Sequence, residues 1–297
     1  MSVEHKLFGK AVQIKKIGCC SGNAMGFPIP ASVNLFVKTT NRCNACCAFC
    51  SNGGKKEVAE DFDADKLFRC IDEILSNGII LNRLNLTGGE PSVVPNVVHE
   101  IIARLKSQER YDRIHLHLNT NGLSDVAYEI MRSPRIDSIS MSLHHYDRQR
   151  LSSIYRRDIS DNFCRFEGID LNKVNLSCNL IKGFIDSNEE TQKMLDFTIG
   201  LNIPRIGFVA LMPVNSFCKE HFVDLEDIGI EKIPHVYFTK SKNRSANCKC
   251  SNYLYNRNAK ILEIYMRNYM NPAYCESSLL FDGQYLRQGF QDNNIIY

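Results

Sequence analysis

The feature that most constrains the fold of this 297-residue chain is a repeated alternation of apolar and amphipathic segments. Between residues 31 and 215, each apolar segment ends in a polar loop, and apolar residues at helical spacing follow. The predicted strands are 32–38, 83–86, 113–118, 136–143, 173–181 and 205–211. Alternation of this kind favours a parallel sheet with right-handed helical crossovers, hence an α/β fold. Six units are fewer than the eight of a closed barrel.

The stretches between these strands carry helix signals. Asp63 is suited to an N-cap and Asn77-Gly78 to a helix stop, which predicts a helix between them. Apolar residues between Val97 and Leu105 predict the next helix. Three more helices are predicted at 124–131, 148–155 and 189–199.

Four cysteines crowd the loop after the first predicted strand. Cys43, Cys47 and Cys50 have the spacing C-x3-C-x2-C, and three thiolates this close can hold three irons of a 4Fe–4S cluster. Structural zinc usually takes four ligands in two pairs, and the two CxxC pairs here lack a thioredoxin-like context. The triplet therefore favours an iron–sulfur cluster, while the spacing leaves Cys43, Cys46 and Cys50 as an alternative set.

Composition narrows the class of protein further. The net charge of +3 and the absence of a densely basic stretch argue against nucleic-acid or membrane partners. The chain has 13 cysteines, an odd number, and no unbroken apolar segment of a signal peptide or membrane span. We therefore expect a cytoplasmic protein, in which crowded cysteines indicate metal or redox chemistry.

The flanks do not follow the alternation. Residues 1–30 are predicted to be an N-terminal tail or flanking element, and residues 216–297 a C-terminal extension. Within the extension, residues 256–270 are predicted to form one amphipathic helix, and Asp282-Gly283 a hairpin turn.

The cysteine loop resembles the signature of the radical S-adenosylmethionine (radical SAM) superfamily, including an aromatic residue, Phe49, before the last cysteine. Gly88-Gly89-Glu90-Pro91, after the second predicted strand, resembles that superfamily's Gly-Gly-Glu motif. The resemblance implies a partial (β/α)6 TIM-like barrel. It also implies that Cys43, Cys47 and Cys50 are the cluster ligands and Cys46 a neighbour.

The same resemblance implies the cofactors and the reaction. S-adenosylmethionine would chelate the open iron, and an electron from the reduced cluster would cleave it to a 5′-deoxyadenosyl radical. The enzyme would be oxygen-sensitive and would need an external one-electron donor such as a flavodoxin or ferredoxin. Glycine permits close backbone approach, and by resemblance Gly88 and Gly89 contact the methionine moiety, with Glu90 beside them.

Within the superfamily, the chain resembles the branch of the molybdenum-cofactor GTP cyclase and the SPASM-twitch enzymes. Thr120-Asn121-Gly122 resembles the third strand ending of that branch, which implies that Thr120 is a cofactor-binding residue. By the same resemblance, Ser142 at the fourth strand end would contact S-adenosylmethionine, and Met212 after the sixth would meet its adenine.

Several positions depart from the GTP cyclase. Its substrate-binding arginine on the first strand is Phe36 here, and Glu276-Ser277-Ser278 stands where it has an arginine pair. A triphosphate would be poorly neutralised without those cations. We therefore expect a peptide or small natural-product substrate, with a divergent nucleotide cyclase as the alternative. A hypothesis of another class is a non-catalytic binding protein stabilised by metal.

The branch also holds a second iron–sulfur cluster in its C-terminal region. Here Cys248, Cys250 and Cys275 are the candidate ligands of such an auxiliary cluster, with Cys218 a weaker fourth. The alternative is that these cysteines are ordinary reduced thiols.

Overall fold

The computed structural model describes residues 2–15, 31–51, 61–239, 250–269, 277–289 and 294–297. Most described strands join one 11-stranded sheet in the order β13-β12-β3-β4-β5-β6-β7-β8-β11-β10-β9. Its strands are β3 (Ser32–Lys38), β4 (Ile80–Thr87), β5 (His115–Thr120), β6 (Ser138–Ser142), β7 (Val174–Leu180), β8 (Arg205–Ala210), β9 (Val236–Thr239), β10 (Ser251–Arg257), β11 (Lys260–Arg267), β12 (Ser278–Phe281) and β13 (Leu286–Arg287).

Helices separate the strands of the central part. They are α1 (Ala64–Ser76), α2 (Pro95–Lys106), α3 (Asp125–Met131), α4 (Arg148–Tyr155), α5 (Asn188–Gly200), α6 (Ser216–Glu220) and α7 (Leu225–Ile228). Four short 3-10 turns accompany them, at Pro91–Val93, Glu109–Tyr111, Leu171–Lys173 and Ile230–Lys232.

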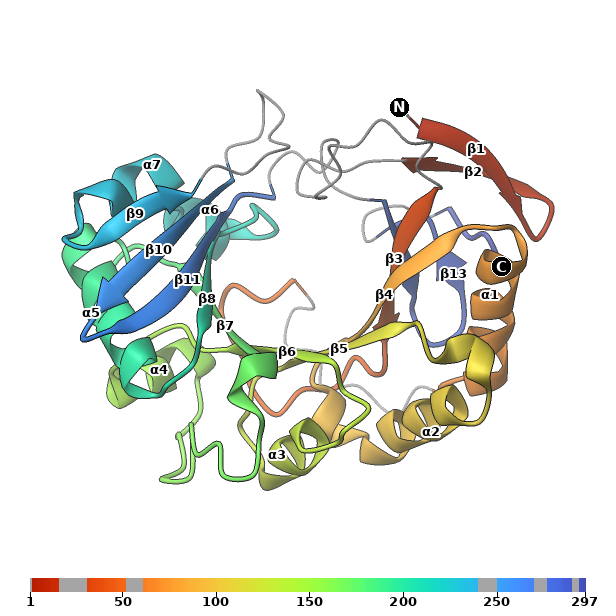
Figure 1. Cartoon of the computed structure of the whole chain (residues 1–297), viewed down its shortest axis with the longest axis horizontal. Coiled ribbons are helices and arrows are strands. Elements are labelled where there is room, and N and C mark those ends of the chain that lie inside the picture. Colours follow the sequence, from red (N-terminus) through yellow and green to blue (C-terminus); the bar gives the residue numbers. More distant parts are fainter. Residues whose placement is uncertain (1, 16–30, 52–60, 240–249, 270–276, 290–293) are drawn as a thin grey trace.

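The central strands β3 to β8 pair in chain order and all run parallel. In Figure 1 the sheet curves into an open arc, and α1 to α5 lie on its outer side. The predicted α/β fold with a central parallel sheet is therefore confirmed, as are the five predicted helices between its strands. The side chain of Asp63 accepts a hydrogen bond from Lys66 N at 2.8 Å, so it is the N-cap of α1.

The two faces of the arc differ in chemistry because side chains alternate along a strand. Apolar residues such as Leu35, Leu86 and Leu118 are fully buried in the layer beneath the helices. The alternate positions face the concave side and are mostly polar: Asn34, Phe36, Lys38, Arg83, Asn85, Thr87, His115, His117, Asn119, Ser138, Ser140, Ser142, Asn175, Ser177 and Asn179. A polar inner face of this kind can surround a polar ligand.

The prediction of a helix at residues 256–270 is wrong, because residues 256–267 belong to the antiparallel hairpin β10–β11. Leu262, Ile264 and Met266 are buried and alternate with more exposed residues, which is the two-residue period of a strand. The turn residues Asn258 and Ala259 have φ of 52° and 59°, as a two-residue hairpin turn requires.

The C-terminal region adds strands to both sides of the central sheet. Strand β11 pairs in parallel with β8, and β12 pairs in parallel with β3. The predicted hairpin at Asp282-Gly283 is confirmed, since β12 and β13 pair antiparallel across it. Strands β9 to β13 of the C-terminal region therefore belong to the same sheet as β3 to β8.

The N-terminal flank contains a hairpin, β1 (Ser2–Leu7) with β2 (Lys10–Lys15), that forms a separate two-stranded sheet. Leu7, Val12 and Ile14 are fully buried in the main core. Phe8 stacks on Tyr297 with ring centroids 3.8 Å apart, so the turn of this hairpin packs against the C-terminal residue.

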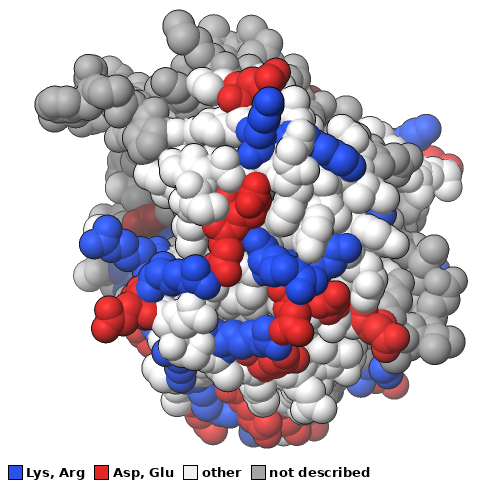
Figure 2. All heavy atoms as spheres, turned by 90° about the vertical axis from the view of Figure 1, so that its right-hand side faces the viewer, with Lys and Arg blue, Asp and Glu red and all other residues white. Residues whose placement is uncertain are grey.

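The outer surface over α1 and α2 carries charges of both signs. Figure 2 shows acidic and basic side chains interspersed on this face. Arg104 pairs with Asp65 at 2.5 Å and with Glu100 at 2.9 Å. Among the described residues, no helix combines the length and the apolar character needed to cross a bilayer.

Candidate metal and cofactor site

The three predicted ligands lie on the loop that follows β3, at the carboxyl end of the parallel strands. Cys43, Cys47 and Cys50 are free thiols of intermediate exposure. The loop starts beside the end of β4, where Thr39 N donates to Thr87 O at 2.9 Å. In parallel α/β folds, sites form at this end of the sheet.

The electrostatics of the thiols indicate that they lie close together. Burial raises the pKa of Cys47 to about 12, and the neighbouring Cys43, Cys50 and Cys46 add to the shift. Burial is also the main cause that raises the pKa of Cys43, with Glu90 and Cys50 contributing. Neighbouring thiolates repel one another, so a cationic group between them would stabilise their deprotonated form.

The donor set is of the kind that holds a 4Fe–4S cluster. Among the described residues, no three His, Cys, Asp or Glu side chains converge on one point as a single metal ion requires. In a 4Fe–4S cluster each thiolate binds a different iron, so the three sulfur atoms surround the cluster without converging.

Gly88 and Gly89 hold the start of the cysteine loop by direct backbone contact. A Cβ on Gly89 would lie 1.9 Å from Arg42 O, and a Cβ on Gly88 2.4 Å from Thr40 O. Gly89 N donates to Thr40 O at 2.7 Å. Gly88 also has φ of +136°, a conformation that side chains disfavour. Only glycine fits at both positions.

Glu90 ties this turn to the end of β5. Its carboxylate is 1% exposed and accepts hydrogen bonds from Thr120 Oγ1 at 2.7 Å, Asn121 N at 2.7 Å and Ser92 N at 3.1 Å. Burial raises the pKa of Glu90, and these bonds oppose the shift. The structure thus brings Glu90 and Thr120, both predicted as cofactor residues, into direct contact.

Asn121 is a site residue to which the sequence assigned no role. Its Nδ2 donates to Cys43 Sγ at 3.7 Å and to Asn44 Oδ1 at 2.7 Å. Hydrogen bonds to ligand sulfur tune an iron–sulfur centre. The sequence signal that could have identified Asn121 was its position between Thr120 and Gly122, at the end of a predicted strand.

The rest of the loop is held from two further strand ends. Cys46 N donates to Tyr155 O at 3.0 Å, and the Tyr155 hydroxyl donates to Ser142 O at 2.7 Å. On the side of α6, Asn215 Nδ2 donates to Ala48 O at 3.1 Å and Cys218 Sγ to Phe49 O at 3.5 Å. The cysteine loop is therefore fixed by residues far apart in the sequence.

Comparison with known proteins places this arrangement in a family. The profile of the Radical SAM superfamily matches residues 37–198. The chain belongs to the radical SAM superfamily. Membership implies an enzyme that holds a 4Fe–4S cluster and binds S-adenosylmethionine, in agreement with the donor set described above.

Relatives within this superfamily are distant. The chain is 25% identical over 223 residues to a GTP 3′,8-cyclase of Peptoclostridium acidaminophilum, covering 71% of this chain and 66% of the relative. It is 23% identical over 188 residues to a GTP 3′,8-cyclase of Ectopseudomonas mendocina, covering 61% and 55%. The chain thus spans between about half and two thirds of the length of these curated relatives.

A solved radical SAM structure shares the fold. The radical SAM methyltransferase from Sphaerobacter thermophilus superimposes with a TM-score of 0.53 at 19% identity. The match covers 70% of this chain and 64% of that one. At this identity the likeness concerns the fold alone.

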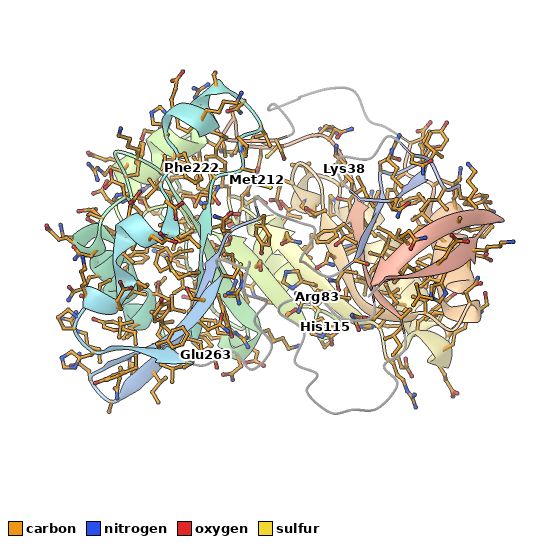
Figure 3. The ribbon with its side chains drawn as sticks, turned by 90° about the horizontal axis from the view of Figure 1, so that it is seen from above. Lys38, Arg83, His115, Met212, Phe222 and Glu263 are labelled. Atoms are coloured by element: carbon orange, nitrogen blue, oxygen red, sulfur yellow. The ribbon has the colours of Figure 1, made fainter. Side chains whose placement is uncertain are left out.

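The remaining predicted cofactor residues lie at the same end of the radical SAM sheet. Ser142 ends β6 and is partly exposed, while Met212 follows β8 and is 41% exposed. Figure 3 looks into the opening of the arc and shows Met212 and Lys38 at one end of it. The contacts of Ser142 and Met212 with S-adenosylmethionine stay predictions.

His144 and His145 follow β6. His144 Nδ1 accepts from Asn179 N at 3.0 Å, and its ring packs edge-on against Phe49 with centroids 4.8 Å apart. Burial lowers the pKa of His144 to about 3, so its ring is neutral. His145 lies 3.7 Å from Glu190. Both rings have partners within the protein.

Of the predicted auxiliary ligands, the structure describes only Cys250. It is 5% exposed, at the start of β10, and its Sγ accepts a hydrogen bond from Asn268 N at 3.3 Å. Cys248 and Cys275 lie outside the described residues. Cys218, the weaker candidate, lies beside the first cysteine loop instead.

Proposed function

We propose that this chain is a radical SAM enzyme in which Cys43, Cys47 and Cys50 hold the 4Fe–4S cluster. The observation that carries this proposal is the placement of three free thiols at C-x3-C-x2-C spacing on one loop at the carboxyl end of the parallel strands, beside the Gly88-Gly89 turn. We interpret the curved sheet of β3 to β8 as the wall of a partial (β/α)6 TIM-like barrel. Residues 216–297 would form a C-terminal extension that adds strands to both edges of this wall.

The chain's own residues would bind and orient S-adenosylmethionine. Gly88 and Gly89 present backbone next to the loop, and Glu90 fixes Thr120 behind it. Ser142 and Met212 frame the other side from β6 and β8. A 4Fe–4S cluster held by the three cysteines would supply the electron for reductive cleavage of S-adenosylmethionine. The concave face would exclude water from the reacting groups.

The proposed substrate is a peptide or small natural product from which the radical abstracts a hydrogen atom. Phe36 supports this choice, because it places an apolar ring on the inner face where the GTP cyclase has an arginine. A divergent nucleotide cyclase is the second candidate, and the cyclase relatives favour it. A flavodoxin or ferredoxin is the proposed electron donor.

Anaerobic reconstitution with iron and sulfide, followed by dithionite and S-adenosylmethionine, tests the proposal. We expect 5′-deoxyadenosine, and we expect Cys43→Ala, Cys47→Ala and Cys50→Ala each to lose iron and this product. Cys46→Ala is the matched control and should keep both. A zinc-only protein that leaves S-adenosylmethionine intact would favour the metal-stabilised binding protein.

The iron content also decides the auxiliary cluster. About eight irons per chain would support a second cluster on Cys248, Cys250 and Cys275, since each 4Fe–4S cluster holds four. A count of about four would remove it. Incubation with GTP and search for a cyclised product separates the nucleotide cyclase from the peptide enzyme.

A further inference from the structure

Five polar residues form a compact group on the concave face, at the first residues of β5 and β6 and along the middle of β4. We call Arg83, Asn85, His115, His117 and Ser138 the inner polar block. Arg83 lies opposite His115 and Asn85 opposite His117, while His117 lies opposite Ser138. Residues opposite one another in parallel strands point to the same face, so the five side chains adjoin.

The inner polar block lies away from the cysteine loop. Figure 3 shows Arg83 and His115 within the opening of the arc, with Lys38 and Met212 toward its other end. His115 starts β5 and Arg83 lies midway along β4, whereas Lys38 ends β3 and Met212 lies beyond the carboxyl end of β8. A molecule bound between the two ends would contact both.

The two histidines share one hydroxyl group. Ser138 Oγ lies 2.6 Å from His115 Nε2 and 2.7 Å from His117 Nδ1. A hydroxyl donates one hydrogen, so one imidazole must donate to Ser138 and the other accept from it. Burial, and then the charge of Arg83, lower the pKa of both rings, that of His117 to about 3. Both are therefore neutral, and Arg83 carries the charge of the block.

Two donors of the block lack an acceptor. Asn85 is 3% exposed, yet its Nδ2 has no hydrogen-bond partner among the described residues. A buried donor left unpaired costs free energy, which a ligand acceptor would recover. No carboxylate in the described part of the chain pairs with Arg83. The Asn85 amide therefore lacks a hydrogen-bond acceptor, and the Arg83 guanidinium lacks an anionic partner among the described residues.

We propose that the inner polar block binds an oxyanionic group of the substrate, a carboxylate or a phosphate, through Arg83 and Asn85. Arg83 supplies the charge and a planar fork of donors, and Asn85 supplies a buried N–H. The neutral histidines, fixed by Ser138, line the group and add no further charge. This inference rests on the proposed function and specifies its substrate: a molecule with an anionic end and a reacting carbon at the cluster end.

Anion binding to the reconstituted full chain tests the proposal. Isothermal titration with inorganic phosphate and, separately, with acetate should show saturable binding of at least one of them, and the tighter one identifies the source. Arg83→Gln and Asn85→Leu should each weaken that affinity at least tenfold. Asn85→Leu removes an unpaired buried amide, so we expect it to fold at least as stably as the natural chain.

The controls separate this proposal from the proposed function. Arg69→Gln removes an exposed arginine on α1 and should bind the anion as the natural chain does. If neither anion binds saturably, or if Arg83→Gln and Asn85→Leu bind it normally, the inner polar block does not bind an oxyanion. Formation of 5′-deoxyadenosine by the natural chain is measured separately. Failure of the anion-binding proposal can therefore be distinguished from failure of the proposed radical SAM activity.

Discussion

At the scale of single residues, Gly89 illustrates how strictly the site constrains the chain. A Cβ there would lie 1.9 Å from Arg42 O, and both sides of this contact are backbone that cannot rotate away. We expect Gly89→Ala to lower the free energy of unfolding by about 1–3 kcal/mol or more, and to reduce iron content. Gly200, at the end of α5, has no atom within 4 Å of an added Cβ, so Gly200→Ala should be harmless. Chemical denaturation and iron analysis measure both effects. A Gly89→Ala protein with normal stability and iron would contradict this account of the turn.

His117 is a residue whose burial should be visible in the pH dependence of stability. Its folded pKa is about 3 against an ordinary value of 6.5. Between these values the unfolded chain holds the proton and the folded protein does not, so stability falls as pH falls through 6.5 toward 3. The contribution is at most about 1.4 kcal/mol per pH unit. His117→Asn should flatten the slope of unfolding free energy between pH 5 and 7, measured by anaerobic urea denaturation. The exposed His99→Asn should leave it unchanged.

At the scale of elements, β12 shows how the C-terminal region supports the site. It pairs with β3, which leads directly into the cysteine loop, and Phe281 at its end is fully buried. Phe281→Ala should lower the free energy of unfolding by about 3–5 kcal/mol, because it leaves a cavity. Phe238→Ala is the matched control: this ring on β9 is 52% exposed, and its loss should cost below about 1 kcal/mol. Thermal unfolding compares the two, and equal effects would argue against β12 as a support of β3.

At the scale of the whole molecule, the sheet joins residues 31–215 to residues 216–297 in one structure. Beyond the pairings of β3 with β12 and β8 with β11, the Tyr255 hydroxyl donates to Asp196 Oδ1 at 2.7 Å, which links β10 to α5. A fragment of residues 31–215 would expose two long strand edges. We expect it to aggregate or to melt without a sharp transition, whereas the full chain unfolds in one cooperative step. Size-exclusion chromatography and circular dichroism check this, and a sharply melting monomeric fragment would show an independent domain.

The sequence predicted the central sheet and the cysteine loop because both depend on local patterns. Strand and helix periods and the C-x3-C-x2-C spacing are visible without any tertiary contact. The hairpin β10–β11 was missed because Ile261 and Ile264, like Leu262 and Met266, also have the three- and four-residue spacing of a helix, and pairing with β8 decided between the two. Asn121 and Tyr155 were missed as supports of the loop because their contacts join residues dozens of positions apart.

The order of strands in the sheet has a consequence for the behaviour of the protein in crowded solution. The two outermost described strands, β9 and β13, have only four and two residues, whereas the central parallel strands β3 to β8 have five to eight. Open backbone groups on an edge can recruit a strand from a neighbouring molecule, and short edges offer few of them. The added C-terminal strands therefore replace the long edges of β3 and β8 by short ones, which we expect to lower the tendency of the protein to associate through its sheet.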